Sequence, residues 1–193
     1  MTLEKKPSFL KDIATLFKVR LGFFIVLSAG LGWFMGVETI DIKSIMLLAT
    51  GGYLLTGASN GLNQIIERDT DAIMSRTKNR PLPTGRMSVK TALLLSISAG
   101  IVGIFCLGLL NYISAILGVV SLILYVFFYT TLKSRSTLCV FVGAIPGALP
   151  PMIGYVAATG ELGIEPGVLF AVQFMWQFPH FWAIAWLAHE DYS

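Results

Sequence analysis

The sequence predicts an all-α polytopic membrane protein, a helical bundle around a central cavity. Hydrophobic residues make up 55% of its 193 residues, charged residues only 13%, and the mean hydropathy is +0.74. Soluble domains carry roughly 25% charged residues, so this composition indicates apolar helices joined by short charged loops. The net charge of +3 does not indicate a nucleic-acid partner, because the cations lie in those loops.

Six stretches approach the length of about 20 apolar residues that a helix needs to cross a bilayer. They run Leu21–Val37, Ser44–Ile66, Thr91–Leu110, Tyr112–Leu132, Leu138–Ala158 and Gly167–Ala188. All six contain small residues that allow close helix packing in lipid. Little beyond Asn111 separates the third stretch from the fourth, which predicts a tight helical hairpin. Prolines inside the fifth and sixth stretches predict kinks that shape a cavity.

The first 20 residues read as an amphipathic, cytoplasmic lead-in that lies at the membrane interface before the first span. They do not resemble a signal peptide, because the charged region is long and no small-residue cleavage site follows. The two cysteines, Cys106 and Cys139, lie in apolar stretches without metal-ligand spacing, so we interpret them as packing residues.

The positive charges predict the orientation. All of the 14 Lys and Arg residues except Lys43 lie in the N-terminal segment, in the Arg68–Lys90 connection, or at Lys133 and Arg135. These regions fall on one side of the membrane if the six spans alternate. The positive-inside rule therefore places the N-terminus and these loops in the cytoplasm. The lack of an Arg-rich, acid-poor leader favours a bacterial plasma membrane over a mitochondrial one.

The stretch from Asn60 to Arg86 carries most of the unusual polar chemistry. At about 100° per residue, four of its polar residues share one narrow helical stripe: Asn60, Asn63, Glu67 and Asp71. Asp69 lies on the reverse side, so Glu67 and Asp71 are the acidic pair that is best placed to act together. A solvated helix end with local ion pairs is the alternative, but it does not explain why the polar stripe continues into the membrane.

Four cations follow this stripe in the next loop: Arg76, Lys78, Arg80 and Arg86. A carboxylate face beside cations suits a magnesium-bound diphosphate, because the metal takes carboxylate oxygens and guanidinium groups hold phosphate oxygens. Arg76 and Arg80 would align if their segment is helical, whereas the positive-inside rule is sufficient to explain Lys78 and Arg86. Lys133 reads mainly as a topological charge, although it could reach the same mouth together with Tyr129.

A second polar group lies near the end of the chain. Four residues share one face if the helix continues through Pro179: Gln173, Gln177, His180 and Asp191. Such side chains are costly in hydrocarbon and should face the bundle interior. His180 taken alone is more typical of a hydrogen-bonded interior histidine than of a ligand. Glu190 and Asp191 lie on the same side of the membrane as the first motif, which predicts a two-sided metal–diphosphate site.

These motifs resemble a known family. The block Asn63-x-x-x-Glu67-x-x-x-Asp71 resembles the first aspartate-rich motif of the UbiA-type intramembrane prenyltransferases, in which Asp is more usual at the position of Glu67. The runs RTKNRPLP (76–83) and WQFPHF (176–181) resemble the branch of this family that farnesylates protohaem IX. The resemblance extends from residue 18 to residue 193.

The resemblance implies a single transmembrane domain over residues 1–193. The family fold has about nine membrane helices, so the six spans imply a C-terminally truncated domain. The implied enzyme transfers a farnesyl group from farnesyl diphosphate to a vinyl group of haem B and makes haem O. The implied cofactor is Mg²⁺, and the implied partners are the lipid bilayer, haem A synthase and terminal oxidase assembly factors.

The resemblance also implies roles for individual residues. Mg²⁺ would be held by Asn63, Glu67 and Asp71, with Glu190 and Asp191 matching the start of the second acidic motif. Ala188 and Tyr192 stand where other members often have Asp. The leaving diphosphate would be neutralised by Arg76 and Arg80, and Asn60 would support the same wall. His180 would face the porphyrin as an iron ligand or as an orienting group.

Two alternatives remain at this stage. A related prenyltransferase could act on an aromatic ring or quinone precursor, although a small aromatic acceptor needs no porphyrin-facing His180. A non-catalytic transporter or membrane assembly protein is the other alternative. Transporters typically show midplane charges or internally repeated broken helices, whereas the ionisable residues here gather at one mouth.

Overall fold

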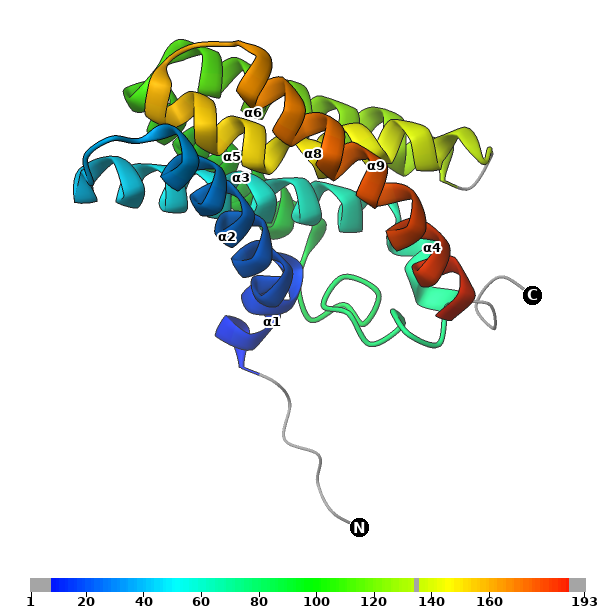
Figure 1. Cartoon of the computed structure of the whole chain (residues 1–193). Coiled ribbons are helices and arrows are strands. Elements are labelled where there is room, and N and C mark those ends of the chain that lie inside the picture. Colours follow the sequence, from blue (N-terminus) through cyan, green and yellow to red (C-terminus); the bar gives the residue numbers. More distant parts are fainter. Residues whose placement is uncertain (1–7, 134–135, 188–193) are drawn as a thin grey trace.

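The computed structural model describes residues 8–133 and 136–187 (Figure 1), and every ordered element in these ranges is helical. The elements are α1 (Phe9–Leu16), α2 (Val19–Gly36), α3 (Ile42–Ile66), α4 (Arg68–Ile73), α5 (Val89–Leu110), α6 (Tyr112–Ile123), the π-helical turn η1 (Leu124–Tyr129), α7 (Thr130–Leu132), α8 (Leu138–Thr159) and α9 (Ile164–Leu187). The predicted all-α fold class is confirmed.

Five described segments are long and apolar enough to cross a membrane. They are Val19–Gly36, Val89–Leu110, Tyr112–Leu132, Leu138–Thr159 and Ile164–Leu187. The remaining predicted span, Ser44–Ile66, lies in α3, whose 25 residues suffice in length. Its asparagines, Gln64 and glycines lower its hydropathy, so length and composition support five spans rather than six. Because α3 packs against α2 and α5, its polar residues Asn60, Asn63 and Gln64 are buried among protein side chains. The chain is an integral membrane protein.

Helices α2 and α8 pack closely because small residues line their interface. A Cβ atom on Gly154 of α8 would collide with the backbone carbonyl oxygen of Ala29 on α2. Beside this contact, Trp33 is only 1% exposed and shares a core with Leu149 and Ile153. In lipid, where helices gain little from hydrophobic association, such close contacts provide much of the packing energy.

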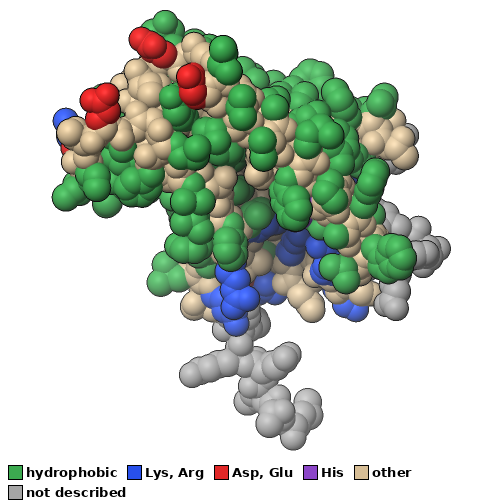
Figure 2. Space-filling model, in the orientation of Figure 1, with side chains coloured by type: hydrophobic (Ala, Val, Ile, Leu, Met, Phe, Trp, Pro, Cys, Tyr) green, Lys and Arg blue, Asp and Glu red, His purple; other side chains and the backbone are tan. Residues whose placement is uncertain are grey.

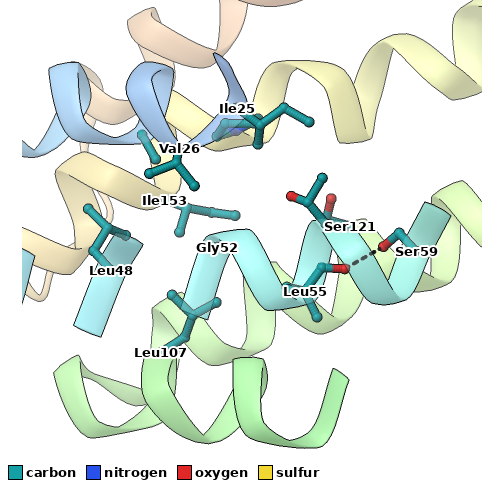
Figure 3. A pocket seen from close by; sticks show the side chains of 12 residues that line it. Ile25, Val26, Leu48, Gly52, Leu55, Ser59, Leu107, Ser121 and Ile153 are labelled. Atoms are coloured by element: carbon teal, nitrogen blue, oxygen red, sulfur yellow. Dashed lines mark hydrogen bonds between the residues drawn. The ribbon is translucent and has the colours of Figure 1, made fainter. Parts of the chain in front are cut away.

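A small cavity lies between α2, α3, α5, α6 and α8. Its volume is about 60 Å³, and its walls are mainly aliphatic side chains such as Leu48, Leu107 and Ile153 (Figure 3). Pro150 also lines it, although α8 remains helical through its three prolines. This volume is well below the roughly 300–1,000 Å³ of small-molecule pockets. This cavity is therefore a small apolar void between these five helices.

The tight hairpin between α5 and α6 is confirmed. Asn111 ends α5 and caps α6, because its Oδ1 accepts a hydrogen bond from Ser114 N at 2.8 Å. Its Nδ2 donates to the backbone carbonyl of Val156 on α8 at 2.8 Å. The Asn111 side chain thus accepts from a free N–H at the start of α6 and also connects the hairpin to α8 by a hydrogen bond.

Charge is distributed unevenly along the bundle. In the view of Figure 2, most of the Lys and Arg side chains gather toward the end that carries α1, and the visible Asp and Glu side chains lie toward the opposite end. The connection between α4 and α5 also lies at the α1 end (Figure 1). This arrangement is the one that the loop charges predicted, and it gives the bundle one cationic mouth.

Candidate functional site

The predicted polar stripe is continuous across the junction of α3 and α4. Glu67 is both the C-cap residue of α3 and the N-cap residue of α4. Its N–H donates to Asn63 O at 2.9 Å, and its carbonyl accepts from Asp71 N at 2.7 Å. Asn60, Asn63 and Asp71 are only 2–3% exposed, whereas the Asp69 side chain is 88% exposed. The stripe is therefore not a solvated helix end.

Asp71 is paired with Arg80 across the following loop. Arg80 Nη1 donates to Asp71 Oδ2 at 2.6 Å, and both side chains are largely buried. Thr77 Oγ1 donates to the Asp71 backbone carbonyl at 3.0 Å. These contacts fold the cationic loop back over the carboxylate, so the predicted proximity of the acidic stripe and the cations is confirmed for this pair.

A second cation reaches the stripe from the end of α7. Lys133 Nζ lies 3.4 Å from Glu67 Oε1. One turn earlier, Thr130 Oγ1 accepts a hydrogen bond from Asn63 Nδ2 at 3.1 Å and donates to Tyr125 O at 2.9 Å. That second bond spans five residues within the π-helical turn. The sequence pattern did not identify Thr130, whereas Lys133 had been considered as a possible neighbour of this mouth.

Lys18 is a site residue that sequence reasoning missed. It lies in the turn between α1 and α2 with a left-handed backbone (φ 49°, ψ 59°), a conformation that is uncommon for a residue with a side chain. Burial, together with the nearby Arg80 and Lys133, lowers the pKa of Lys18 to about 8, although Glu67 and Asp71 act in the opposite direction. Lys18 therefore shares the mouth with both ion pairs.

The donor set fits a magnesium ion. Mg²⁺ prefers oxygen ligands, usually one or two carboxylates together with substrate phosphates. Glu67 and Asp71 supply carboxylates, and Asn60 Oδ1 is buried without a hydrogen-bond partner among the described residues. The described ranges contain no cluster of three His, Cys, Asp or Glu side chains. The predicted ligands Glu190 and Asp191 lie outside the described residues.

The remaining predicted site residues among the described ones lie in the loop after α4 and on α9. Residues 74–87 form turns and bends rather than a helix, so the condition under which Arg76 and Arg80 would align is not met, and Arg76 is exposed. On α9, Gln177 faces α8 and donates to Gly147 O at 3.1 Å, but His180 is exposed. Among the described residues α9 packs chiefly against α8, and the interior position of His180 stays a prediction.

Comparisons with known proteins agree with this arrangement. The model of the UbiA prenyltransferase family matches residues 16–193. A protoheme IX farnesyltransferase from Christiangramia forsetii is 52% identical over 96% of this chain, and one from Flavobacterium psychrophilum is 47% identical over all of it. The chain spans 62% and 65% of the lengths of these two relatives.

Solved structures show the same fold. A structure described as digeranylgeranylglyceryl phosphate synthase matches with a TM-score of 0.78 at 20% identity. The match covers 86% of this chain and 58% of the chain in that structure. A UbiA homologue from Archaeoglobus fulgidus, bound to GPP and Mg²⁺, matches with a TM-score of 0.71 at 16% identity. The match covers 88% of this chain and 62% of the homologue's chain. The chain belongs to the UbiA prenyltransferase family.

Proposed function

We propose that the protein is a Mg²⁺-dependent prenyltransferase that moves a farnesyl group from farnesyl diphosphate to a vinyl group of protohaem IX (haem B), making haem O. The names of the two bacterial relatives support this substrate pair. The observation that carries the proposal is the pairing of buried Asp71 with Arg80 and of Glu67 with Lys133 at one mouth.

The charges of the mouth suit a metal-bound diphosphate. Lys18, Arg80 and Lys133 outnumber the carboxylates of Glu67 and Asp71 by one positive charge, and this excess favours an anionic ligand. A bound Mg²⁺ would supply Lewis-acid stabilisation of the negative charge on the departing diphosphate. Glu67, Asp71 and the amides of Asn60 and Asn63 would hold the ion.

The chain's own cations would act on the leaving group. Arg80 and Lys133 already lie at carboxylate oxygens, so each is within reach of a diphosphate bound to the same carboxylates through a metal. Fixed positive charge at this point stabilises the negative charge that grows on the diphosphate as the allylic carbon–oxygen bond breaks. Arg76, on the exposed part of the loop, would add charge at the rim.

Water must be kept from the allylic cation, which water would convert to farnesol. The buried wall formed by Asn60 and Asn63 leads from the mouth into apolar helix packing, and excluding water from such a site also strengthens its electrostatic interactions. We propose that His180, exposed on α9, faces the porphyrin of the acceptor. Glu190 and Asp191 would complete the metal site from the other side.

We further propose that the protein lies in a bacterial plasma membrane with the cationic mouth in the cytoplasm. The separation of positive and negative ends in Figure 2 supports this orientation through the positive-inside rule. A functional connection to haem A synthase or to oxidase assembly factors rests on the resemblance alone and stays a prediction.

The proposed function is tested with membranes from cells that express the complete gene. They receive haem B, farnesyl diphosphate and Mg²⁺, and the products are separated and weighed by mass spectrometry. A farnesyl adduct of haem that forms only with Mg²⁺ is expected. Unmodified haem together with a prenylated small aromatic acceptor would move the assignment to another branch of the family. No product with any acceptor would contradict the enzyme assignment.

A related prediction concerns Lys18. Lys18→Met should raise the KM for farnesyl diphosphate by roughly ten- to a hundredfold, because a hydrogen bond to a charged group contributes about 1.5–3 kcal/mol. A lysine is charged below its pKa, so the wild-type KM should also rise as the pH increases through about 8. Burial is the largest cause of this lowered pKa, Arg80 and Lys133 lower it further, and Glu67 and Asp71 act in the opposite direction.

The measurement is KM against pH on both sides of that value, with Lys18→Arg as the matched control. Arginine stays charged throughout this range, so its KM should remain flat where the wild-type KM rises. An unchanged KM in Lys18→Met would exclude Lys18 from diphosphate binding.

A further inference from the structure

A buried ion pair joins the N-terminal helix α1 to the cationic loop. Arg86 Nε donates to Asp12 at 3.1 Å from Oδ1 and 3.4 Å from Oδ2. Asp12 is only 4% exposed, and a buried charge that loses its partner is strongly destabilising. The seating of α1 on the loop therefore depends on Arg86, a residue for which the positive-inside rule had seemed a sufficient explanation.

The same guanidinium also holds the loop segment that carries Arg80. Arg86 Nη2 donates to the backbone carbonyl of Asn79 at 2.8 Å. Asn79 directly precedes Arg80, whose side chain reaches Asp71. Arg86 thus links α1 to the peptide from which the diphosphate-facing cation projects.

Backbone hydrogen bonds make this part of the loop a closed unit. Met87 N donates to Pro81 O at 3.1 Å, and Thr84 N donates to Arg80 O at 3.2 Å. Thr84 Oγ1 donates to the same Arg80 carbonyl at 2.7 Å. Because the unit is braced internally, a displacement of Arg86 would be transmitted to Arg80 rather than absorbed by the loop.

Helix α1 is in turn attached to the stripe helix α3. Gln64 Nε2 donates to the carbonyls of Thr15 at 3.2 Å and Leu16 at 2.8 Å, at the end of α1. Leu16 is fully buried in a small core with Leu82 and Met87 of the loop. Lys18 follows Leu16 by two residues, so the seating of α1 also sets the position of this lysine.

We propose that Asp12 and Arg86 are positioning residues, which place Arg80 and Lys18 in the mouth without touching the substrate themselves. This inference rests on the proposed function, because it assigns the pair a purpose in diphosphate binding. It goes beyond that function because it assigns α1 the role of positioning Arg80 and Lys18, in addition to lying at the membrane interface.

The test compares Asp12→Asn, Arg86→Gln and the double variant in the complete protein. Each single variant should raise the KM for farnesyl diphosphate by roughly ten- to a hundredfold, because losing a hydrogen bond from a charged group to the ligand costs about 1.5–3 kcal/mol. The KM for haem B should stay unchanged. The double variant should lose no more than the worse single variant, because residues that act as one unit are not additive.

Two readouts separate positioning from general destabilisation. The first is calorimetric binding of farnesyl diphosphate with Mg²⁺, measured below the unfolding temperature of each variant. The second is the KM for haem B, which should stay at its wild-type value if only the diphosphate end of the site is disturbed. Arg86→Lys keeps the charge but lacks the planar fork that reaches both Asp12 and Asn79. The Arg86→Lys variant should therefore bind farnesyl diphosphate less tightly than the wild type does, even if the two proteins are equally stable.

Asp69→Asn is the matched control, because Asp69 also pairs with an arginine, Arg68, but on the exposed reverse side. It should leave both KM values unchanged. Wild-type affinity for farnesyl diphosphate in stably folded Asp12→Asn and Arg86→Lys would overturn the inference. Absence of product from the wild type would instead overturn the proposed function, so the two failures are distinguishable.

Discussion

Replacing Asp71 with Asn should reduce kcat/KM for prenyl transfer by at least about a hundredfold, the loss typical of removing one group that stabilises transition-state charge. Asp71 is buried, and its carboxylate is the group that Arg80 contacts at 2.6 Å. Asparagine preserves the shape of the side chain but removes the negative charge that a magnesium ion requires. The substitution also leaves Arg80 without its carboxylate partner.

The measurement is product formation by the complete protein as a function of Mg²⁺ concentration. Calorimetric binding of farnesyl diphosphate with Mg²⁺ provides a second readout. Asp69→Asn is the control. It removes the same charge only two residues before Asp71, but on the exposed reverse side of α4. Equal activity of the two variants would show that the acidic stripe is not the metal site. Thermal unfolding of both variants separates a loss of chemistry from a loss of fold.

Replacing Gly154 with Val should largely prevent the bundle from folding. The Cβ atom of any larger residue would collide with the Ala29 backbone carbonyl, which is part of a helix and cannot turn aside as a side chain can. Overpacking in a core typically costs about 1–3 kcal/mol, and the extra methyl groups of valine add to this. Separation of α2 from α8 would also expose Trp33, which is now almost completely buried.

Gly30→Ala in the same helix α2 is the matched control, because a Cβ atom there meets nothing within 4 Å. We expect this variant to unfold at or slightly above the wild-type temperature, since alanine favours helix more than glycine does. The measurement is the yield of monodisperse protein in detergent and its thermal unfolding. Normal yield and stability of Gly154→Val would mean that α2 and α8 are not in the close contact described above.

Hydropathy and charge predicted most of the architecture. Over the described residues, all six predicted stretches lie almost entirely in helices, because a bilayer leaves the backbone few other ways to satisfy its hydrogen bonds. The exception is the number of spans. Helix α3 is long enough to cross a membrane, but its buried polar stripe makes it less apolar than its neighbours. The predicted hairpin at Asn111 was confirmed for a similarly local reason, since one residue between two apolar runs leaves no other connection.

The candidate site was predictable only where its residues lie on one helix. Helical periodicity brought Asn60, Asn63, Glu67 and Asp71 together, and the structure confirms that this stripe stays continuous through the cap at Glu67. Periodicity failed for Arg76 and Arg80, because their segment forms turns. For His180 periodicity is not sufficient, since the exposure of a side chain on α9 depends on which neighbours cover that helix.

The sequence by itself determined that this is a helical membrane protein with an acidic stripe that ends in a cationic loop. Both properties follow from local physics, namely the cost of burying polar backbone in lipid and the angular spacing of residues in a helix. Only the tertiary structure decided which cation meets which carboxylate, and that Lys18, Thr130 and Asp12 belong with the stripe. Contacts between residues far apart in the chain depend on how the helices pack, and no local pattern encodes that arrangement.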